Sequence, residues 1–275
     1  MRSCWPRPSA WRSTNGPSLT RPERGRHWVR VHRVGVCGTD LHAFAGRQAF
    51  VRYPLILGHE LAVEVVAVGP HSSGEAAPVA VGDRCAVLPY VADGTCQACR
   101  AGTPNSCTTL QVLGVHVDGG LRPWWTLPTS LLLPANDLPL DALALAEMLA
   151  VGAHAVHRAG DLRGRRVLVV GAGPIGLATL AFAHPQAAET WVYDLDPARL
   201  RFAEAQELAS AIAAPVVPDT DAEGALIASL RGAMGGDLPE VVFDATGSRA
   251  SMERAPGRVA PGGRVVLVGL LRPGR

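Results

Sequence analysis

The sequence predicts a two-domain α/β protein in which a β-rich domain precedes a doubly wound parallel sheet. Its 275 residues are enough for about two domains. Up to about residue 140, short β-rich runs follow one another between Gly, Pro and Asp turn signals, as expected for a small β-barrel or sandwich. Beyond that point helix-like and strand-like stretches alternate, which is the pattern of a parallel sheet with helices on both faces.

The composition is that of a globular protein. Hydrophobic residues make up 48% of the chain and charged residues 18%, which argues against a disordered chain, and no apolar run reaches the roughly 18 residues of a membrane span. All 26 basic residues are arginine, which excludes a phosphate-binding P-loop and Schiff-base chemistry, because both need a lysine. Beyond residue 33, 18 arginines face 23 acids. This weakly acidic body argues against nucleic acid as a partner.

The first part of the chain changes character near residue 27. Residues 1–26 carry four prolines and no helical or strand periodicity, so they are expected to form an irregular leader. The β-rich domain is placed at residues 27–140. Its clearest strand-like runs are WVRVHRVGV, ELAVEVVAVG and RCAVLPYV.

The second domain is placed at residues 141–275. A helix is expected over residues 141–160, followed by the fully buried strand RRVLVV. Helices near 174–184 and 198–213 then alternate with the strand-like runs WVYD, VVFDA and RVVLVGL.

A glycine-rich turn follows the first strand of this domain. The pattern GxGxxG comes directly after RRVLVV and opens the helix PIGLATLAFA, which is the context of a dinucleotide-binding turn. Its first glycine makes the tight turn, its second lets the backbone approach a pyrophosphate, and its third allows close packing of helix and strand. The helix N-terminus then faces the phosphate charge. The predicted pyrophosphate-binding residues are Gly171, Gly173, Pro174, Ile175 and Gly176.

Other cofactor contacts are expected at the ends of the following strands. Asp194 lies eighteen residues after the last glycine of the turn, at the end of WVYD, where a carboxylate accepts the ribose hydroxyls of NAD and repels the 2′-phosphate of NADP. Arg199 is a nearby cation that leaves NADP open. Gly247 and Gly269 also follow strands, at the edge of the sheet where ligands bind, and are expected on the nicotinamide side.

The β-rich domain holds the residue types of a metal site. Cys37 begins the segment CGTDLH, and His59 and Glu60 follow Gly58. Thiolate, imidazole and carboxylate are ligands of a catalytic zinc ion that keeps one position open. Such an ion lowers the pKa of a hydroxyl group bound at that position. Thr39 and His42 are candidates to carry the released proton to solvent. Asp40 is a candidate to orient a ligating imidazole.

Three of the six cysteines cluster within twelve residues. Such spacing in a domain of this size indicates metal binding rather than disulfides, and a reducing, cytoplasmic environment. Cys96, Cys99 and Cys107 carry this pattern.

Together these motifs identify a family. The chain resembles the zinc-dependent medium-chain alcohol and polyol dehydrogenases over about residues 28–270. The matching motifs, in order, are CGTDLH, LGHE, VGDR, the cysteine cluster, EMLAVGAHAV and VLVVGAGPIG. The segment LGVHVDGG at residues 113–120 is similar to the branch that oxidises sugar acids and polyols, such as gulonate or galactonate.

The resemblance implies a GroES-like catalytic domain joined to a Rossmann domain. It implies zinc on Cys37, His59 and Glu147, with Glu60 binding directly or through water, and a proton relay through Thr39 and His42. It also implies a second, structural zinc on the cysteine cluster, where Asp93 stands in place of the first cysteine. Three reduced thiols in a loop remain the alternative for that cluster.

The expected function is NAD-dependent oxidation of a secondary alcohol of a polyol or sugar acid, by a homodimer or homotetramer. Three features depart from the family pattern: the leader, the pair Ala62 and Val63 in place of the usual glycine after GHE, and an apparent truncation after RVVLVGL. Two alternatives follow: an inactive remnant of such a dehydrogenase, and a zinc-free reductase of the same superfamily. The presence of Cys37, His59 and Glu147 argues against the reductase.

Overall fold

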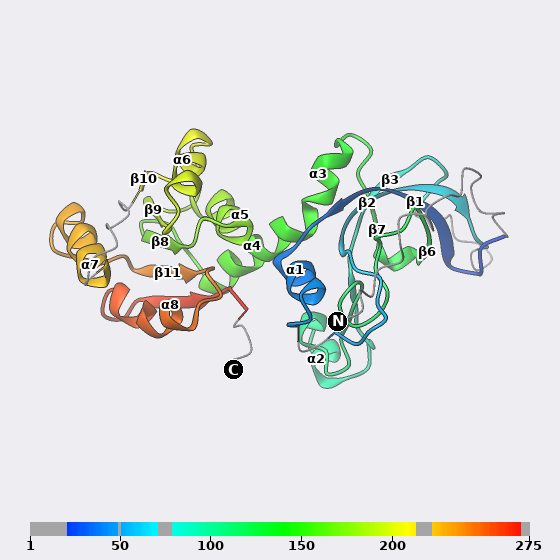
Figure 1. Ribbon diagram of the computed structural model, residues 1–275, viewed down its shortest axis with the longest axis horizontal. Helices are drawn as coiled ribbons and strands as arrows, with labels where there is room; N and C mark the ends of the chain where they lie inside the picture. Colours follow the sequence, from blue (N-terminus) through cyan, green and yellow to red (C-terminus); the bar gives the residue numbers. More distant parts are fainter. Residues whose placement is uncertain (1–20, 49–50, 71–78, 213–221, 271–275) are drawn as a thin grey trace. The chain divides into compact units, whose positions relative to one another are not determined.

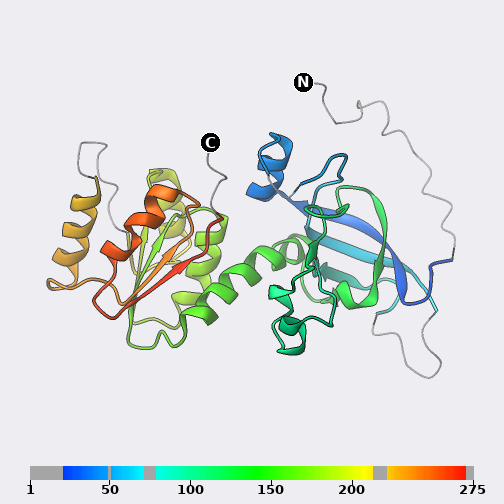
Figure 2. The same cartoon turned by 90° about the horizontal axis from the view of Figure 1, so that it is seen from below.

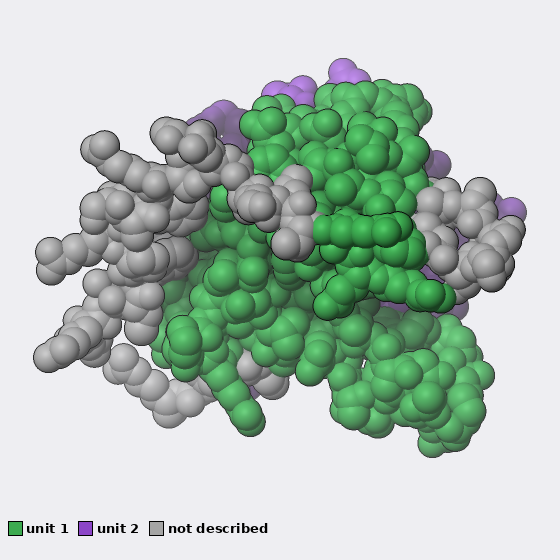
Figure 3. Space-filling model, turned by 90° about the vertical axis from the view of Figure 1, so that its right-hand side faces the viewer, with its two compact units in different colours: residues 1–147 green, residues 148–275 purple. Residues whose placement is uncertain are grey.

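The computed structural model describes residues 21–48, 51–70, 79–212 and 222–270. Most of the predicted leader therefore lies outside the described residues. The chain divides into two compact units, residues 1–147 and 148–275 (Figure 3). No helix of the described residues is both long enough and apolar enough to cross a bilayer.

The first unit is built on a five-stranded antiparallel sheet with the order β6-β1-β2-β3-β7 (Figures 1 and 2). Its strands are β1 (Arg26–Gly35), β2 (Glu60–Val68), β3 (Arg84–Val87), β6 (Trp124–Pro128) and β7 (Leu132–Pro134). The short strands β4 (Tyr90–Val91) and β5 (Gln111–Val112) pair separately. All three strand-like runs predicted for this domain form strands.

The side chains of strand β2 alternate between two apolar clusters. Leu61, Val63 and Val65 point into one apolar cluster, while Ala62 lies in a second cluster with Leu143. Successive side chains of a strand face opposite sides of the sheet, so β2 is covered on both faces. The other elements of the unit are α1 (Gly38–Phe44), α2 (Gln97–Arg100), α3 (Leu140–Ala144), η2 (Pro104–Ser106) and η3 (Thr129–Leu131).

The second unit contains a parallel sheet with the order β10-β9-β8-β11-β12. Its strands are β8 (Arg166–Val170), β9 (Glu189–Tyr193), β10 (Ala211–Ile212), β11 (Val241–Asp244) and β12 (Arg264–Leu267). The order reverses direction next to β8, the first strand, which is the topology of a dinucleotide-binding domain. The predicted α/β class with a doubly wound parallel sheet is confirmed.

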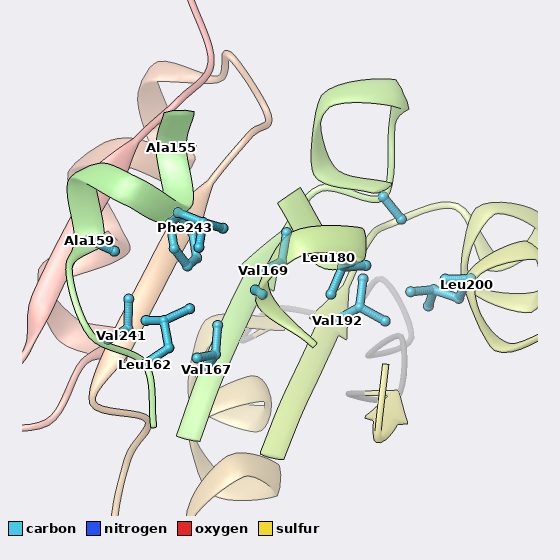
Figure 4. Close-up of a cluster of buried hydrophobic side chains, with 14 residues drawn as sticks. Ala155, Ala159, Leu162, Val167, Val169, Leu180, Val192, Leu200, Val241 and Phe243 are labelled. Carbon is cyan, nitrogen blue, oxygen red and sulfur yellow. The ribbon is translucent and has the colours of Figure 1, made fainter. Parts of the chain in front are cut away.

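Helices cover both faces of this sheet (Figure 1). Val167 and Val169 of β8 face a cluster formed with α4, α5 and α6 (Figure 4), while Leu168 and Val170 face a second cluster with α7. A strand that is buried on both faces has a continuous apolar sequence. This explains why four apolar residues follow one another in the RVLVV sequence of β8. The helices are α4 (Ala146–Ala159), α5 (Pro174–Ala183), α6 (Pro197–Ala205), α7 (Ala222–Ala233), α8 (Arg249–Arg254) and η4 (Ala255–Arg258).

Two predicted helices differ from those observed. The helix expected over residues 141–160 is divided at Leu145 into α3 and α4. The reason is that Leu143 and Ala144 pack on the first sheet whereas Ala155 and Ala159 pack on the second. The helix expected over 198–213 ends at Ala205, and residues 211–212 instead pair with β9.

Candidate functional site

The segment CGTD forms the capped start of helix α1. The Cys37 sulfur accepts a hydrogen bond from the backbone N–H of Thr39 at 3.5 Å, and the Asp40 carboxylate accepts one from the N–H of Cys37 at 2.9 Å. This reciprocal arrangement is a capping box. It fixes the backbone that carries the Cys37 thiol.

Asp40 also connects this helix to the turn that precedes β2. Its second carboxylate oxygen accepts a hydrogen bond from the N–H of Gly58 at 3.3 Å and lies 3.7 Å from Nδ1 of His59. Gly58 has φ +96°, a conformation that favours glycine. One buried carboxylate therefore connects the two segments that supply the thiol and the imidazole, and its predicted role in orienting the imidazole stays a prediction.

The segment LGVHVDGG packs directly on the same turn. The N–H groups of Gly119 and Gly120 donate to the carbonyl oxygens of Ile56 and Gly58 at 2.7 and 2.8 Å. The Asp118 carboxylate accepts a hydrogen bond from the N–H of Ile56 at 3.0 Å. We call residues 113–120 the clamp segment, because its backbone and Asp118 form hydrogen bonds with the Gly58 turn.

These constraints bring three donor side chains together. Atoms of Cys37, His59 and Glu60 all lie within 4.8 Å of one another, and the imidazole and the carboxylate are buried. Nδ1 of His59 is buried without a hydrogen-bond partner. Thiolate, imidazole and carboxylate are the donor set of a catalytic zinc site, so the residues present fit this metal.

The electrostatics of the cluster are those of a cation site. Burial lowers the pKa of His59, but a hydrogen bond with Cys37 and the nearby negative groups, Asp40 among them, raise it to about 9. Burial raises the pKa of Glu60 above its ordinary value. Both shifts reflect crowded negative charge in a desolvated place, and a divalent cation relieves that repulsion.

Glu147 lies outside this donor set. Its carboxylate accepts a hydrogen bond from the hydroxyl of Tyr90, and its charge contributes to the raised pKa values of His59 and Glu60. The sequence placed Glu147 ahead of Glu60 as a ligand, whereas the structure brings Glu60 into the set and Glu147 beside it. Tyr90 was missed, because no local pattern shows that a tyrosine of β4 meets a residue 57 positions later.

Thr39 and His42 occupy the helix that Cys37 caps. Both are half-buried and lie three positions apart on α1, so they share one helix face. The arrangement places a hydroxyl and an imidazole on the element that carries the thiol. Their role as a proton relay stays a prediction.

The cysteine cluster forms a second group of donors. Atoms of Asp93, Cys96, Cys99 and Cys107 lie within 4.8 Å of one another. Backbone hydrogen bonds lower the pKa of Cys96 to about 7, whereas desolvation raises that of Cys99 to about 12. At neutral pH the group therefore already includes one readily ionised thiol, which is the form that binds metal.

Asp93 also organises the loop around these cysteines. One carboxylate oxygen accepts hydrogen bonds from the N–H groups of Thr95 and Cys96 at 2.6 and 2.8 Å, and the other accepts one from the Thr109 hydroxyl at 2.7 Å. These bonds hold the pKa of Asp93 below its ordinary range. The carboxylate is therefore ionised and aligned with the thiols, while hydrogen bonds occupy both of its oxygens.

The glycine turn of the second unit has the geometry that the sequence predicted. Gly171 has φ +96°, and its N–H donates to the carbonyl oxygen of Tyr193 at 2.7 Å. A Cβ on Gly176 would overlap the carbonyl oxygen of Gly171, whereas a Cβ on Gly173 would meet no atom closer than 4.0 Å. The first and third glycines thus serve turn and packing, and the second leaves open space. Gly173 caps α5 and Pro174 begins it.

Asp194 and Arg199 lie beside this turn. The Asp194 carboxylate accepts hydrogen bonds from the N–H groups of Ala172 and Asp196 at 2.7 and 2.8 Å, and it lies 3.5 Å from Nη1 of Arg199. The side chain of Arg199 is 55% exposed. The structure thus gathers the glycine turn, the acid and the arginine around one end of α5.

Gly247 and Gly269 contact each other at the ends of β11 and β12. A Cβ on Gly269 would overlap the backbone nitrogen of Gly247. The turn that contains Gly247 also approaches Gly171, because a Cβ on Gly171 would lie 3.1 Å from Cγ2 of Thr246. The predicted cofactor residues therefore lie either just beyond the carboxyl ends of the parallel strands or in the first turns of the helices that follow, α5 and α6.

Comparisons with known proteins find a family match in each of the two units. Residues 23–137 match the family model of the alcohol dehydrogenase GroES-like domain, and residues 174–275 match that of the zinc-binding dehydrogenases. L-Galactonate-5-dehydrogenase of Escherichia coli is 41% identical over 244 residues, which are 89% of this chain and 68% of that protein. Sorbitol dehydrogenase of Arabidopsis thaliana is 34% identical, over 90% of this chain and 69% of that protein.

Solved structures show the same relationship. A zinc-binding dehydrogenase of Sinorhizobium meliloti, crystallised with NADP, superposes with a TM-score of 0.81 at 28% identity, over 93% of this chain and 72% of that chain. The predicted GroES-like and Rossmann folds are thus confirmed. With the donor cluster, the glycine turn and two family models in the predicted order, the chain belongs to the zinc-type medium-chain polyol dehydrogenase family.

Proposed function

We propose that this chain is a zinc-dependent dehydrogenase that transfers a hydride from a secondary alcohol of a polyol or sugar acid to NAD. The observation that carries the proposal is the convergence of Cys37, His59 and Glu60 within 4.8 Å in a buried cluster. The family match supports the reaction class. The names of the L-galactonate and sorbitol enzymes support the substrate class.

The residues of the first unit have distinct roles in this proposal. Cys37, His59 and Glu60 would hold the metal, and Glu147, which accepts a hydrogen bond from Tyr90, is a further carboxylate next to them. When bound, zinc supplies a Lewis acid for the alcohol hydroxyl, and NAD supplies the hydride acceptor. Thr39 accepts the hydroxyl proton and passes it towards His42, whose half-buried ring delivers it to solvent.

The second unit binds the dinucleotide. The open space over Gly173 and the N-terminus of α5 receive the pyrophosphate, and Asp194 accepts the adenosine ribose hydroxyls. The charge of Asp194 favours NAD, although Arg199 stands 3.5 Å away and the Sinorhizobium relative was crystallised with NADP. We propose NAD because Asp194 is nearly buried and fixed by two backbone N–H groups, whereas Arg199 is mostly exposed.

Zinc analysis and a turnover assay on the purified full chain test the proposal. We expect two zinc ions per chain and NADH formation with at least one member of a polyol and aldonate panel, and weaker activity with NADP. Cys37→Ser should remove one zinc and all turnover, whereas Cys96→Ser should remove the other zinc and retain turnover. A chain without zinc would contradict the mechanism. Stoichiometric zinc without turnover on any panel member would instead support the inactive remnant.

A further inference from the structure

A buried ionic network lies at the carboxyl end of β11, directly behind the turn that contains Gly247, and its own residues have no role in the site described so far. Asp244 is fully buried and Arg258 is 3% exposed. The Arg258 guanidinium donates two hydrogen bonds to the Glu223 carboxylate, from Nε at 2.7 Å and from Nη2 at 2.6 Å. The network joins three successive parts of the second unit, α7, β11 and η4.

Ser251 links the arginine to the aspartate. Its hydroxyl donates to one oxygen of Asp244 at 2.6 Å and accepts from Nη1 of Arg258 at 3.0 Å. The same Nη1 lies 3.8 Å from the Asp244 carboxylate. The serine hydroxyl therefore fills the gap between two buried charges that are too far apart for a direct hydrogen bond.

The other oxygen of Asp244 holds the turn that follows β11. It accepts hydrogen bonds from the N–H and the hydroxyl of Thr246 at 3.0 and 2.6 Å. The N–H of Ala245 donates to the carbonyl oxygen of Val170 at 2.9 Å, next to Gly171. A Cβ on Gly171 would lie 3.1 Å from Cγ2 of Thr246. Through these hydrogen bonds, the Asp244 carboxylate holds the Thr246 turn next to the glycine turn.

A buried ion pair is weak evidence for stability, because desolvation offsets most of its attraction. The same charges and hydrogen bonds can nevertheless fix the orientation of the turn after β11, even where they add little to the free energy of unfolding. We propose that Ser251 and Arg258 are positioning residues of the dinucleotide site: through Asp244 they hold the Thr246–Gly247 turn in the place that receives the nicotinamide half of the cofactor. This inference rests on the proposed binding of NAD.

The test compares cofactor binding with stability in Ser251→Ala. NADH affinity is measured by fluorescence, AMP affinity by competition, and Tm by thermal unfolding. We expect Ser251→Ala to raise the Kd for NADH about tenfold, which corresponds to about 1.4 kcal/mol, the size of a hydrogen bond to a charged group. The Kd for AMP should not change, because AMP occupies only the Asp194 side of the sheet. Ser251→Thr keeps the hydroxyl and should restore NADH binding.

Ser210→Ala is the matched control. The Ser210 hydroxyl accepts a hydrogen bond from the N–H of Thr190 at 3.0 Å, near the amino end of β9, so its loss should lower Tm without changing the Kd for NADH. Equal loss of NADH and AMP affinity in Ser251→Ala, or an unchanged Kd for NADH, would overturn this inference alone. A wild-type chain that binds neither ligand would contradict the proposed function as well.

Discussion

Asp40 shows how much of the metal site depends on one side chain. It is 7% exposed, and its two oxygens accept hydrogen bonds from the backbones of Cys37 and Gly58. It carries no ligand atom of the proposed set. Because it joins the two segments that supply the thiol and the imidazole, its charge and shape set their separation.

Asp40→Asn should therefore weaken both the fold and the metal site. An amide offers one acceptor oxygen and a donor NH₂ group, so one of the two backbone N–H groups loses its partner, at a cost of about 1–3 kcal/mol. Urea unfolding of the apo chain and zinc competition with a chelator measure the two effects. Asp161→Asn, a change at an exposed acid bound to Arg163, is the control. Equal zinc affinity in Asp40→Asn and the wild type would contradict this role.

Asp93 is the second residue whose identity decides a site. Its oxygen joins three sulfur atoms, whereas structural zinc sites are built mostly from sulfur and imidazole. Soft thiolates bind zinc more strongly than a carboxylate does in such a set. A zinc ion held by this set would therefore be bound more weakly than one held by four sulfur atoms.

Asp93→Cys should retain zinc at chelator concentrations that strip the cysteine cluster of the wild type. Zinc release monitored with a colorimetric chelator compares the two proteins. Asp161→Cys, which adds a thiol elsewhere on the surface, should not change the release curve. Identical release curves for Asp93→Cys and the wild type would contradict the weakening effect of Asp93, and a wild type that contained one zinc ion rather than two would indicate that the cysteine cluster is three thiols in a loop.

Among the elements of the fold, the clamp segment has a structural role that its sequence motif did not indicate. LGVHVDGG resembles a marker of sugar-acid and polyol dehydrogenases, yet in the structure its glycines lie against the backbone of the Gly58 turn. A Cβ on Gly119 would lie 2.6 Å from Cα of Gly114 and 2.7 Å from the carbonyl oxygen of Leu57. Backbone atoms on both sides leave no room for a side chain.

Gly119→Ala should displace the clamp segment and the His59 turn together. We expect a loss of about 1–3 kcal/mol in unfolding free energy, as for other overpacked sites, and faster zinc release from the Cys37 site. Chemical denaturation and metal-release kinetics give both values. Gly232→Ala is the control, because a Cβ there meets nothing within 4 Å and a helical glycine gains about 1 kcal/mol from alanine. An unchanged zinc release rate would contradict the role of the clamp segment.

At the scale of the whole molecule, the two kinds of site belong to different compact units. Every proposed metal ligand lies within residues 1–147, and every predicted cofactor residue lies within residues 148–275. A ligand stabilises the folded unit that binds it. Local stability within a chain can therefore respond to one ligand at a time.

Metal removal and NADH addition should change amide hydrogen exchange in different units. A chelator should lower protection around residues 37–60 and 93–107 and leave β8, β9 and β11 unchanged. NADH at 100 times its Kd should add about 2.7 kcal/mol of protection to the second unit. Loss of protection in β8 on metal removal would show that the units are coupled in stability.

Local sequence patterns were enough to predict the fold class, the glycine turn with Asp194, and the donor residue types of the two candidate metal sites. Those features depend on local order: GxGxxG after a buried strand, and CxxC spacing in one loop. The remaining features depend on how distant segments pack. Packing brings Glu60 into the donor set with Cys37 and His59 and leaves Glu147 next to that set, it places Tyr90 on Glu147, and it divides one predicted helix between two units. These outcomes depend on contacts between distant segments, where packing and hydrogen bonding outweigh the local propensities that a sequence displays.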